Sequence, residues 1–219
     1  MKKLLKKEFR LCMHPAALIM LGLSALVLIP NYPYAVSYFY MTLGLYFICL
    51  DGRENHDAGY TLSLPVSRKQ AVRGRMLFAC CLEGAQLLLC GLMVLVNRRI
   101  YGPDMTNQAG MDANLAVVGQ GLIVFGLFNG IFFPSWYKDV NKIGGAFLKA
   151  SAAVFLYIAL GVAATYALPF VRDQMDNSLP ECLKSRLIYA ACTLAFYLAA
   201  TGLAQKLSVK RFERLDLAL

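Results

Sequence analysis

Glu83 is an acidic side chain inside an otherwise apolar stretch, residues 76–96, which is long enough to cross a membrane. Burying its charge there would cost about 2.5–3.5 kcal/mol, so such a group is a functional candidate by default. It could contact a cationic substrate or act as an acid or base. It could instead be structural, either protonated or paired with a group on another helix such as Lys149, and we favour this interpretation.

The common catalytic and metal-binding motifs are absent from the sequence. It has no Gly-x-x-x-x-Gly-Lys-Ser/Thr segment to hold ATP phosphates, and no Gly-x-Ser-x-Gly or His-Glu-x-x-His segment. His14 and His56 have no nucleophile or metal ligand at a recognisable spacing, and the seven cysteines include no Cys-x-x-Cys. We therefore predict no catalytic residue, no metal site, no structural disulfide and no cofactor bound by this chain.

Residues 51–75, DGRENHDAGYTLSLPVSRKQAVRGR, could bind a partner protein. Pro65 ends any helix before it, and Ser67 is a favourable N-cap for a helix that runs into the next apolar stretch. Two short helices hinged at a proline would form a docking surface, whereas the alternative is a solvated loop without a partner. The segment is rich in charge, yet it contains the apolar residues Tyr60, Leu62, Leu64 and Val66.

The composition predicts a bundle of membrane helices, which must position Glu83 and residues 51–75. Apolar residues make up 58% of the 219 residues and charged residues 16%, against about 45–50% and 25% in soluble domains. A small soluble globule cannot bury so large an apolar share, and the composition also excludes disordered, collagen-like and disulfide-stabilised chains. We predict an all-α integral membrane protein with a single transmembrane domain over residues 1–219.

Six apolar stretches are long enough to cross the hydrocarbon, some only marginally, since each crossing takes about 17–25 residues. Asn31-Tyr32-Pro33 predicts a tight turn between the first two stretches. A cleavable signal peptide is the alternative for the first, but no small-x-small cleavage site precedes the second, so we favour a retained helix. The six predicted spans are residues 16–30, 34–50, 76–96, 115–136, 147–170 and 187–203.

The distribution of the 22 Lys and Arg residues predicts the orientation. Most lie in the N-terminal tail, the second and fourth connections and the tail 204–219, which places both termini in the cytoplasm of a multi-pass plasma-membrane protein. The net charge of +9 then reflects orientation and attraction to anionic lipid. No nucleic-acid partner is expected, because no stacking aromatics accompany a basic groove. The outer connections contain Arg98, Arg99, Arg172, Lys184 and Arg186, together with Asp104, Asp112, Asp173, Asp176 and Glu181.

Residues 1–14, MKKLLKKEFRLCMH, are amphipathic at helical spacing. Basic side chains, Arg10 among them, flank an apolar stripe. A basic helix with such a stripe lies in the membrane interface, whereas the alternative is a charged tail that only sets the topology. The stripe consists of Leu4, Leu5, Phe9 and Cys12.

Aromatic residues in the second span are candidates for a substrate pathway. At helical spacing Tyr34, Tyr38 and Phe39 could share one face and line this pathway together with Glu83. An interfacial aromatic belt combined with ordinary packing is the alternative.

Small residues in the fourth span predict a close helix contact. Gly119, Gly126 and Gly130 recur at spacings that let helices approach closely. We expect this contact within the subunit rather than between subunits, with Asn129 adding an interhelical hydrogen bond.

The order of these features along the chain resembles that of a permease subunit of the ABC-2 family of ATP-binding-cassette transporters. The matching segments are KKLLKKEFR at the start, ENHDAGYTLSLPVSRKQAVRGR between spans two and three, and the basic tail KRFERLD. The second resembles the family's acidic stretch that ends in Leu-Pro-x-Ser-Arg and leads into a basic helix. The resemblance covers essentially the whole chain. It implies an N-terminal elbow helix, six spans and a cytoplasmic coupling helix that inserts into an ATPase.

The resemblance also implies partners and a mechanism. ABC ATPase subunits would bind ATP and Mg²⁺, and a second permease subunit would complete a homo- or heterodimer that exports substrate by alternating access. The connection 170–187 is too short for the family's usual hairpin. This suggests a minimal exporter of hydrophobic or amphipathic substrates, similar to those that expel phenol-soluble modulins. The alternatives are a non-transporting membrane anchor or sensor and an intramembrane enzyme that uses Glu83.

The resemblance further implies which residues contact the ATPase. Apolar side chains would supply contact area, while charged ones would fix the register through hydrogen bonds. The expected coupling residues are Arg53, Glu54, His56, Asp57, Tyr60, Thr61, Leu62, Leu64, Pro65, Ser67 and Arg68, and those of the elbow helix are Leu4, Leu5, Phe9 and Arg10.

Overall fold

The computed structural model describes residues 1–102, 105–176 and 182–215, and within these ranges every regular element is a helix. This confirms the predicted all-α fold class. In chain order the elements are α1 (Lys2–Leu11), α2 (Pro15–Gly22), the 3₁₀-helix η1 (Leu23–Leu28), α3 (Ala35–Glu54), α4 (Asp57–Ser63), α5 (Arg68–Tyr101), α6 (Leu115–Trp136), α7 (Ile143–Ala167), the π-helical turn η2 (Val171–Asp176) and α8 (Leu183–Glu213).

Within the described residues, five helices are long and apolar enough to cross a membrane: α3, α5, α6, α7 and α8. The chain is therefore a multi-pass membrane protein. The sixth candidate is a broken one, since α1 and the α2–η1 segment count as a span only as a pair bent by 88°. The chain changes to a 3₁₀-helix at Leu23, and within it the Ser24 hydroxyl donates to the carbonyl of Leu21 at 2.7 Å. Because α2 and η1 together rise only about 24 Å, this span is short for a hydrocarbon core of about 30 Å.

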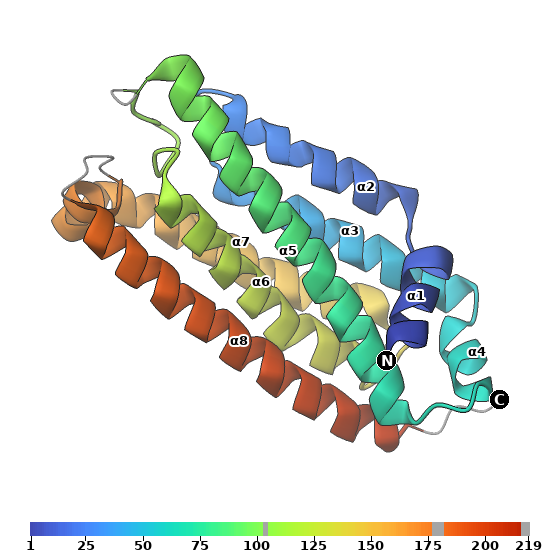
Figure 1. The fold of residues 1–219 in the computed structure, drawn as a ribbon. Coiled ribbons are helices and arrows are strands. Elements are labelled where there is room, and N and C mark those ends of the chain that lie inside the picture. Colours follow the sequence, from blue (N-terminus) through green and yellow to red (C-terminus); the bar gives the residue numbers. More distant parts are fainter. Residues whose placement is uncertain (103–104, 177–181, 216–219) are drawn as a thin grey trace.

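The helices form a bundle with distinct ends (Figure 1). α1, α4 and the last turns of α8 lie at one end, and residues 105–114 and η2 lie at the other. α5 has 34 residues and α8 has 31, so each is about 45–50 Å long and extends beyond the hydrocarbon. Asp104, Glu181 and residues 216–219 of the predicted tail lie outside the described residues.

α6 is the most buried of the spans, and α8 packs closely along it. A Cβ atom on Gly119 would lie 2.6 Å from the Tyr189 ring, and one on Gly126 would lie 2.8 Å from the Phe196 ring. This confirms the close helix contact predicted within the subunit for these two glycines. A Cβ atom on Gly130 would meet no atom within 4 Å, so the prediction was wrong at that position.

Candidate functional site

The segment predicted to dock a partner joins two membrane helices through α4. α3 continues to Glu54, and the turn that follows has His56 in the left-handed region with φ 50°. Beyond Pro65, the Ser67 hydroxyl accepts a hydrogen bond from the backbone of Gln70, whose side chain bonds back to the Ser67 N–H. The predicted pair of helices around Pro65 is therefore present as α4 and the start of α5, and Ser67 is confirmed as the N-cap.

Charged side chains from α1, α4 and α5 meet where α4 packs against the other two helices. The Nε atom of Arg75 lies 3.0 Å from Glu8 Oε2, and its Nη2 atom donates to Asp57 Oδ2. Lys7 Nζ donates to Asp57 Oδ1 at 2.5 Å and to the Thr61 hydroxyl at 2.8 Å. We call these residues the charged joint, and it fixes α4 between α1 and α5.

The charged joint is almost inaccessible to solvent and electrically balanced. Glu8 is 2% exposed and Arg75 6%. Burial raises the pKa of Asp57, but the charge of Arg75 and the hydrogen bond from Lys7 outweigh it, so the pKa lies below its usual value. For Lys7 burial lowers the pKa, and the hydrogen bond to Asp57 and the charge of Glu8 bring it above its usual value. Asp57 and Lys7 therefore both stay charged near neutral pH.

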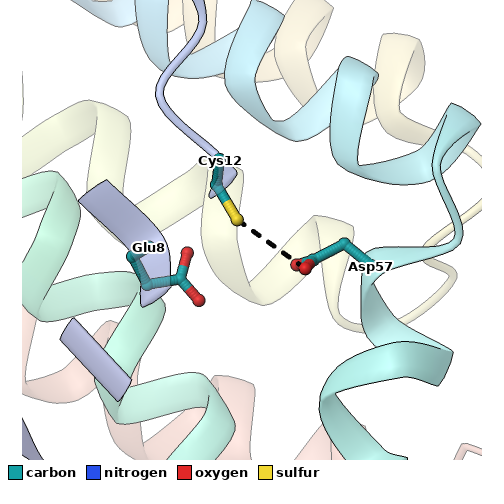
Figure 2. Close-up of side chains that lie close together, drawn as sticks. All are labelled: Glu8, Cys12 and Asp57. Carbon is teal, nitrogen blue, oxygen red and sulfur yellow. Dashed lines mark hydrogen bonds between the residues drawn. The ribbon is translucent and has the colours of Figure 1, made fainter. Parts of the chain in front are cut away.

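Glu8, Cys12 and Asp57 each offer a ligand atom, and these atoms lie within 4.8 Å of one another (Figure 2). Such a group could hold a metal ion, but Arg75 and Lys7 already bind its carboxylates. Burial raises the pKa of the Cys12 thiol to about 11, so the thiol keeps its proton and donates to Asp57 Oδ1 at 3.6 Å. The carboxylates of Glu8 and Asp57 are thus already bound by Arg75, Lys7 and Cys12. This arrangement fits an ion-paired cluster better than a metal site.

α1 buries a face that differs from the predicted apolar stripe. Its inner side consists of Leu4, Glu8 and Cys12, which are all buried, while Phe9 is 40% exposed. Leu4 packs on Gly74 of α5, where a Cβ atom would lie 2.6 Å from its side chain. The buried side of α1 therefore includes an acid, Glu8, that the expected apolar stripe does not contain. Of the other elbow residues, Leu5 is half-buried and Arg10 is exposed.

A cavity of about 730 Å³ lies beside α4. Its walls are the end of α3, α4 itself, the connection between α6 and α7, Arg75, and Phe212 of α8. Five predicted coupling residues line it: Arg53, His56, Asp57, Tyr60 and Thr61.

Other predicted coupling residues lie elsewhere. Arg68 donates to the carbonyls of Phe212, Glu213 and Leu215 and so holds the end of α8. Leu64 and Pro65 line a second hollow against α1, while Leu62 is half-buried and Glu54 forms an exposed pair with Arg53.

The structure separates the residues expected along a substrate pathway. Tyr34 and Tyr38 are buried, and the ring of Tyr38 packs on Gly121 of α6. Phe39 faces α7, with its ring centroid 4.4 Å from that of Phe155. Glu83 is fully buried and bonded to neutral groups, while Lys149 is exposed. A pathway role for these residues remains a prediction.

The long apolar helices define a multi-pass membrane domain. A family model described as "ABC-2 family transporter protein" matches residues 3–213. The chain belongs to this ABC-2 family and is the permease of an ABC transporter, a membrane subunit that associates with an ABC ATPase. Among curated proteins and solved structures, none matches the chain significantly.

Acid is expected to release α4 from the charged joint. The folded-state pKa of Asp57 is lowered, so its stabilising effect is present above the unfolded value of about 3.9 and is lost as pH falls below it. Trp136 is the chain's single tryptophan and lines the cavity beside α4. Its fluorescence should therefore change below about pH 4, and Asp57→Asn should abolish that transition. An identical transition in the variant would assign the effect to another group.

Proposed function

We propose that this permease is the membrane subunit of an ATP-driven exporter in the plasma membrane, with both termini cytoplasmic. Its substrate is hydrophobic or amphipathic, with peptides included, and leaves the cytoplasm or inner leaflet by alternating access. A second permease subunit completes the pathway, and the ATPase subunits bind ATP and Mg²⁺. The observation that carries this proposal is the charged joint, because it connects the predicted docking helix to a membrane span.

The charged joint gives ATPase movement a route into the membrane. A displacement of α4 pulls on Asp57, which is bound both to Arg75 of α5 and to Lys7 of α1. Buried, multiply bonded ion pairs resist separation, so α1 and the start of α5 move with α4. Through α5 the movement reaches the centre of the bundle.

The surface offered to the ATPase is the outer side of α4 with the rim of its cavity. Tyr60 is 51% exposed beside the half-buried Leu62, and the Arg53–Glu54 pair lies at the same end. Exposed tyrosines next to a hollow are typical of interface residues that contribute most of the binding energy.

The outer end of the bundle supports export rather than uptake through an external binding protein. Its described connections are short and fold onto one another. Asn114 Nδ2 donates to the Met175 carbonyl at 2.9 Å, and the backbone N–H of Asp112 donates to Asp176 Oδ1 at 2.5 Å.

Replacing Tyr60 and Leu62 together by alanine is expected to uncouple the transporter. Losing a central aromatic contact commonly costs about 2 kcal/mol, which is about 30-fold in affinity for the ATPase. ATPase copurification and substrate-stimulated hydrolysis should fall, while the thermal stability of the membrane domain stays unchanged.

The matched control for this double variant is Leu88→Ala, because Leu88 is also an exposed apolar residue but lies on the outer face of α5. It should leave both measurements at the wild-type level. Unchanged ATPase binding, hydrolysis and export in the α4 variant would refute the coupling role of α4.

A further inference from the structure

Glu83 is held at the centre of the bundle by two other spans. The hydroxyl of Tyr197 on α8 donates to Glu83 Oε2 at 2.6 Å, and Asn129 Nδ2 on α6 donates to the same oxygen at 3.1 Å. The Asn129 amide nitrogen also lies 3.2 Å from the Thr201 hydroxyl. Glu83 and Tyr197 lie near the middle of α5 and α8.

Two acceptor atoms of this group are buried without a donor. Glu83 Oε1 and Asn129 Oδ1 have no hydrogen-bond partner, although both are sealed from solvent. Leaving a buried acceptor unpaired costs about 1–3 kcal/mol, more if it is charged. Both atoms belong to side chains already joined by the Asn129 Nδ2 to Glu83 Oε2 bond. One hydrogen between Oε1 and Oδ1 would satisfy both at once.

The surroundings of Glu83 offer no positive charge to an ionised carboxylate. Among the described residues, the titratable groups beside it are Tyr197 of α8 and Cys80 of its own helix, while α6 contributes the neutral Asn129. A buried charge without a partner is far costlier than a neutral polar group. A proton satisfies the unpaired acceptors and removes the charge.

We propose that Glu83 is a proton-binding site within the membrane. The carboxyl carries a proton on Oε1 and donates it to Asn129 Oδ1, while its Oε2 accepts from Asn129 and Tyr197. A cyclic acid–amide pair then joins α5 to α6, and the tyrosine joins α5 to α8.

This site makes separation of the helices a proton-releasing step. When α5 moves away from α6 and α8 and water reaches Glu83, the O–H bond breaks, the proton passes to water and a carboxylate remains. Closure returns one proton to the carboxyl. The inference goes beyond the proposed function, because it concerns the bundle alone and does not require ATPase docking at α4.

Infrared spectroscopy of the full chain in lipid nanodiscs tests the proton directly. At neutral pH ordinary carboxyls are ionised, so a carboxylic-acid C=O band should remain in the wild type and disappear in Glu83→Gln. Tyr197→Phe should shift this band, because it removes a hydrogen bond to the same carboxyl. Asp173→Asn is the matched control, since the carboxylate of Asp173 is exposed and paired with Arg172, and it should leave the band unchanged.

Stability supplies an independent measurement. The amide in Glu83→Gln can donate to Asn129 Oδ1 as the acid does, so the variant should fold. As pH rises above about 4.3, the unfolded carboxyl ionises while the folded one keeps its proton, so the wild type should lose stability relative to the variant. The proposal is overturned if the wild type has no carboxylic-acid band at neutral pH. It is equally overturned if the band persists in Glu83→Gln and is not shifted in Tyr197→Phe. It is also overturned if Na⁺ or K⁺ at constant pH abolishes the band, since a metal ion would then occupy the site.

Discussion

Arg75→Ala is expected to lower the free energy of unfolding by about 3–5 kcal/mol, the usual cost of removing one partner from a buried ion pair. The guanidinium is the group that bridges Glu8 on α1 and Asp57 on α4. Without it, Lys7 is the one cation that the described residues leave beside the two buried carboxylates of Glu8 and Asp57. Unfolding of the purified chain in mixed detergent–SDS micelles measures this loss.

Further variants separate the charge of Arg75 from its shape. Arg75→Lys keeps the charge but loses the planar fork that reaches both carboxylates, so its stability should lie between wild type and Arg75→Ala. Combining Arg75→Met with Glu8→Gln and Asp57→Asn should recover most of the loss, because no uncompensated charge remains.

The control for Arg75 is Arg53→Ala, which removes the exposed partner of Glu54. Exposed pairs contribute about 0–1 kcal/mol, so this variant should remain near wild type. Equal effects of Arg75→Ala and Arg53→Ala would show that the charged joint does not hold α4 in place.

Local sequence signals predicted most of the elements in this bundle. Apolar runs located the spans, and Pro65 with Ser67 predicted the boundary between α4 and α5, because capping and helix termination depend on neighbouring residues. The first span was harder to place, since α2 is short and the chain changes to a 3₁₀-helix at Leu23.

Contacts between distant segments account for what the sequence did not reveal. Arg75 pairs with residues 67 and 18 positions earlier, and no local pattern specifies such a pairing. One signal was available: Glu8 lies on the same helical face as Leu4 and Cys12, where an acid requires a buried partner. Likewise, Asn129 was expected to form an interhelical bond, but its partner Glu83 depends on the packing of α5 against α6.

Gly121→Val is expected to destabilise the bundle by about 1–3 kcal/mol through overpacking between α3 and α6. A Cβ atom at Gly121 would lie 2.5–2.7 Å from three ring atoms of Tyr38. The ring is fully buried and rests edge-on against Phe125, so it has no space to withdraw. SDS-induced unfolding again measures the effect.

Gly130→Val is the matched control for this clash, because it lies on the same helix and its Cβ would meet no atom within 4 Å. Both substitutions add the same side chain, so the difference between them isolates the contact with Tyr38. Adding Tyr38→Leu to Gly121→Val should restore part of the lost stability, since it removes the obstructing ring. Equal stability of the two valine variants would contradict the close approach of α3 and α6 at Tyr38.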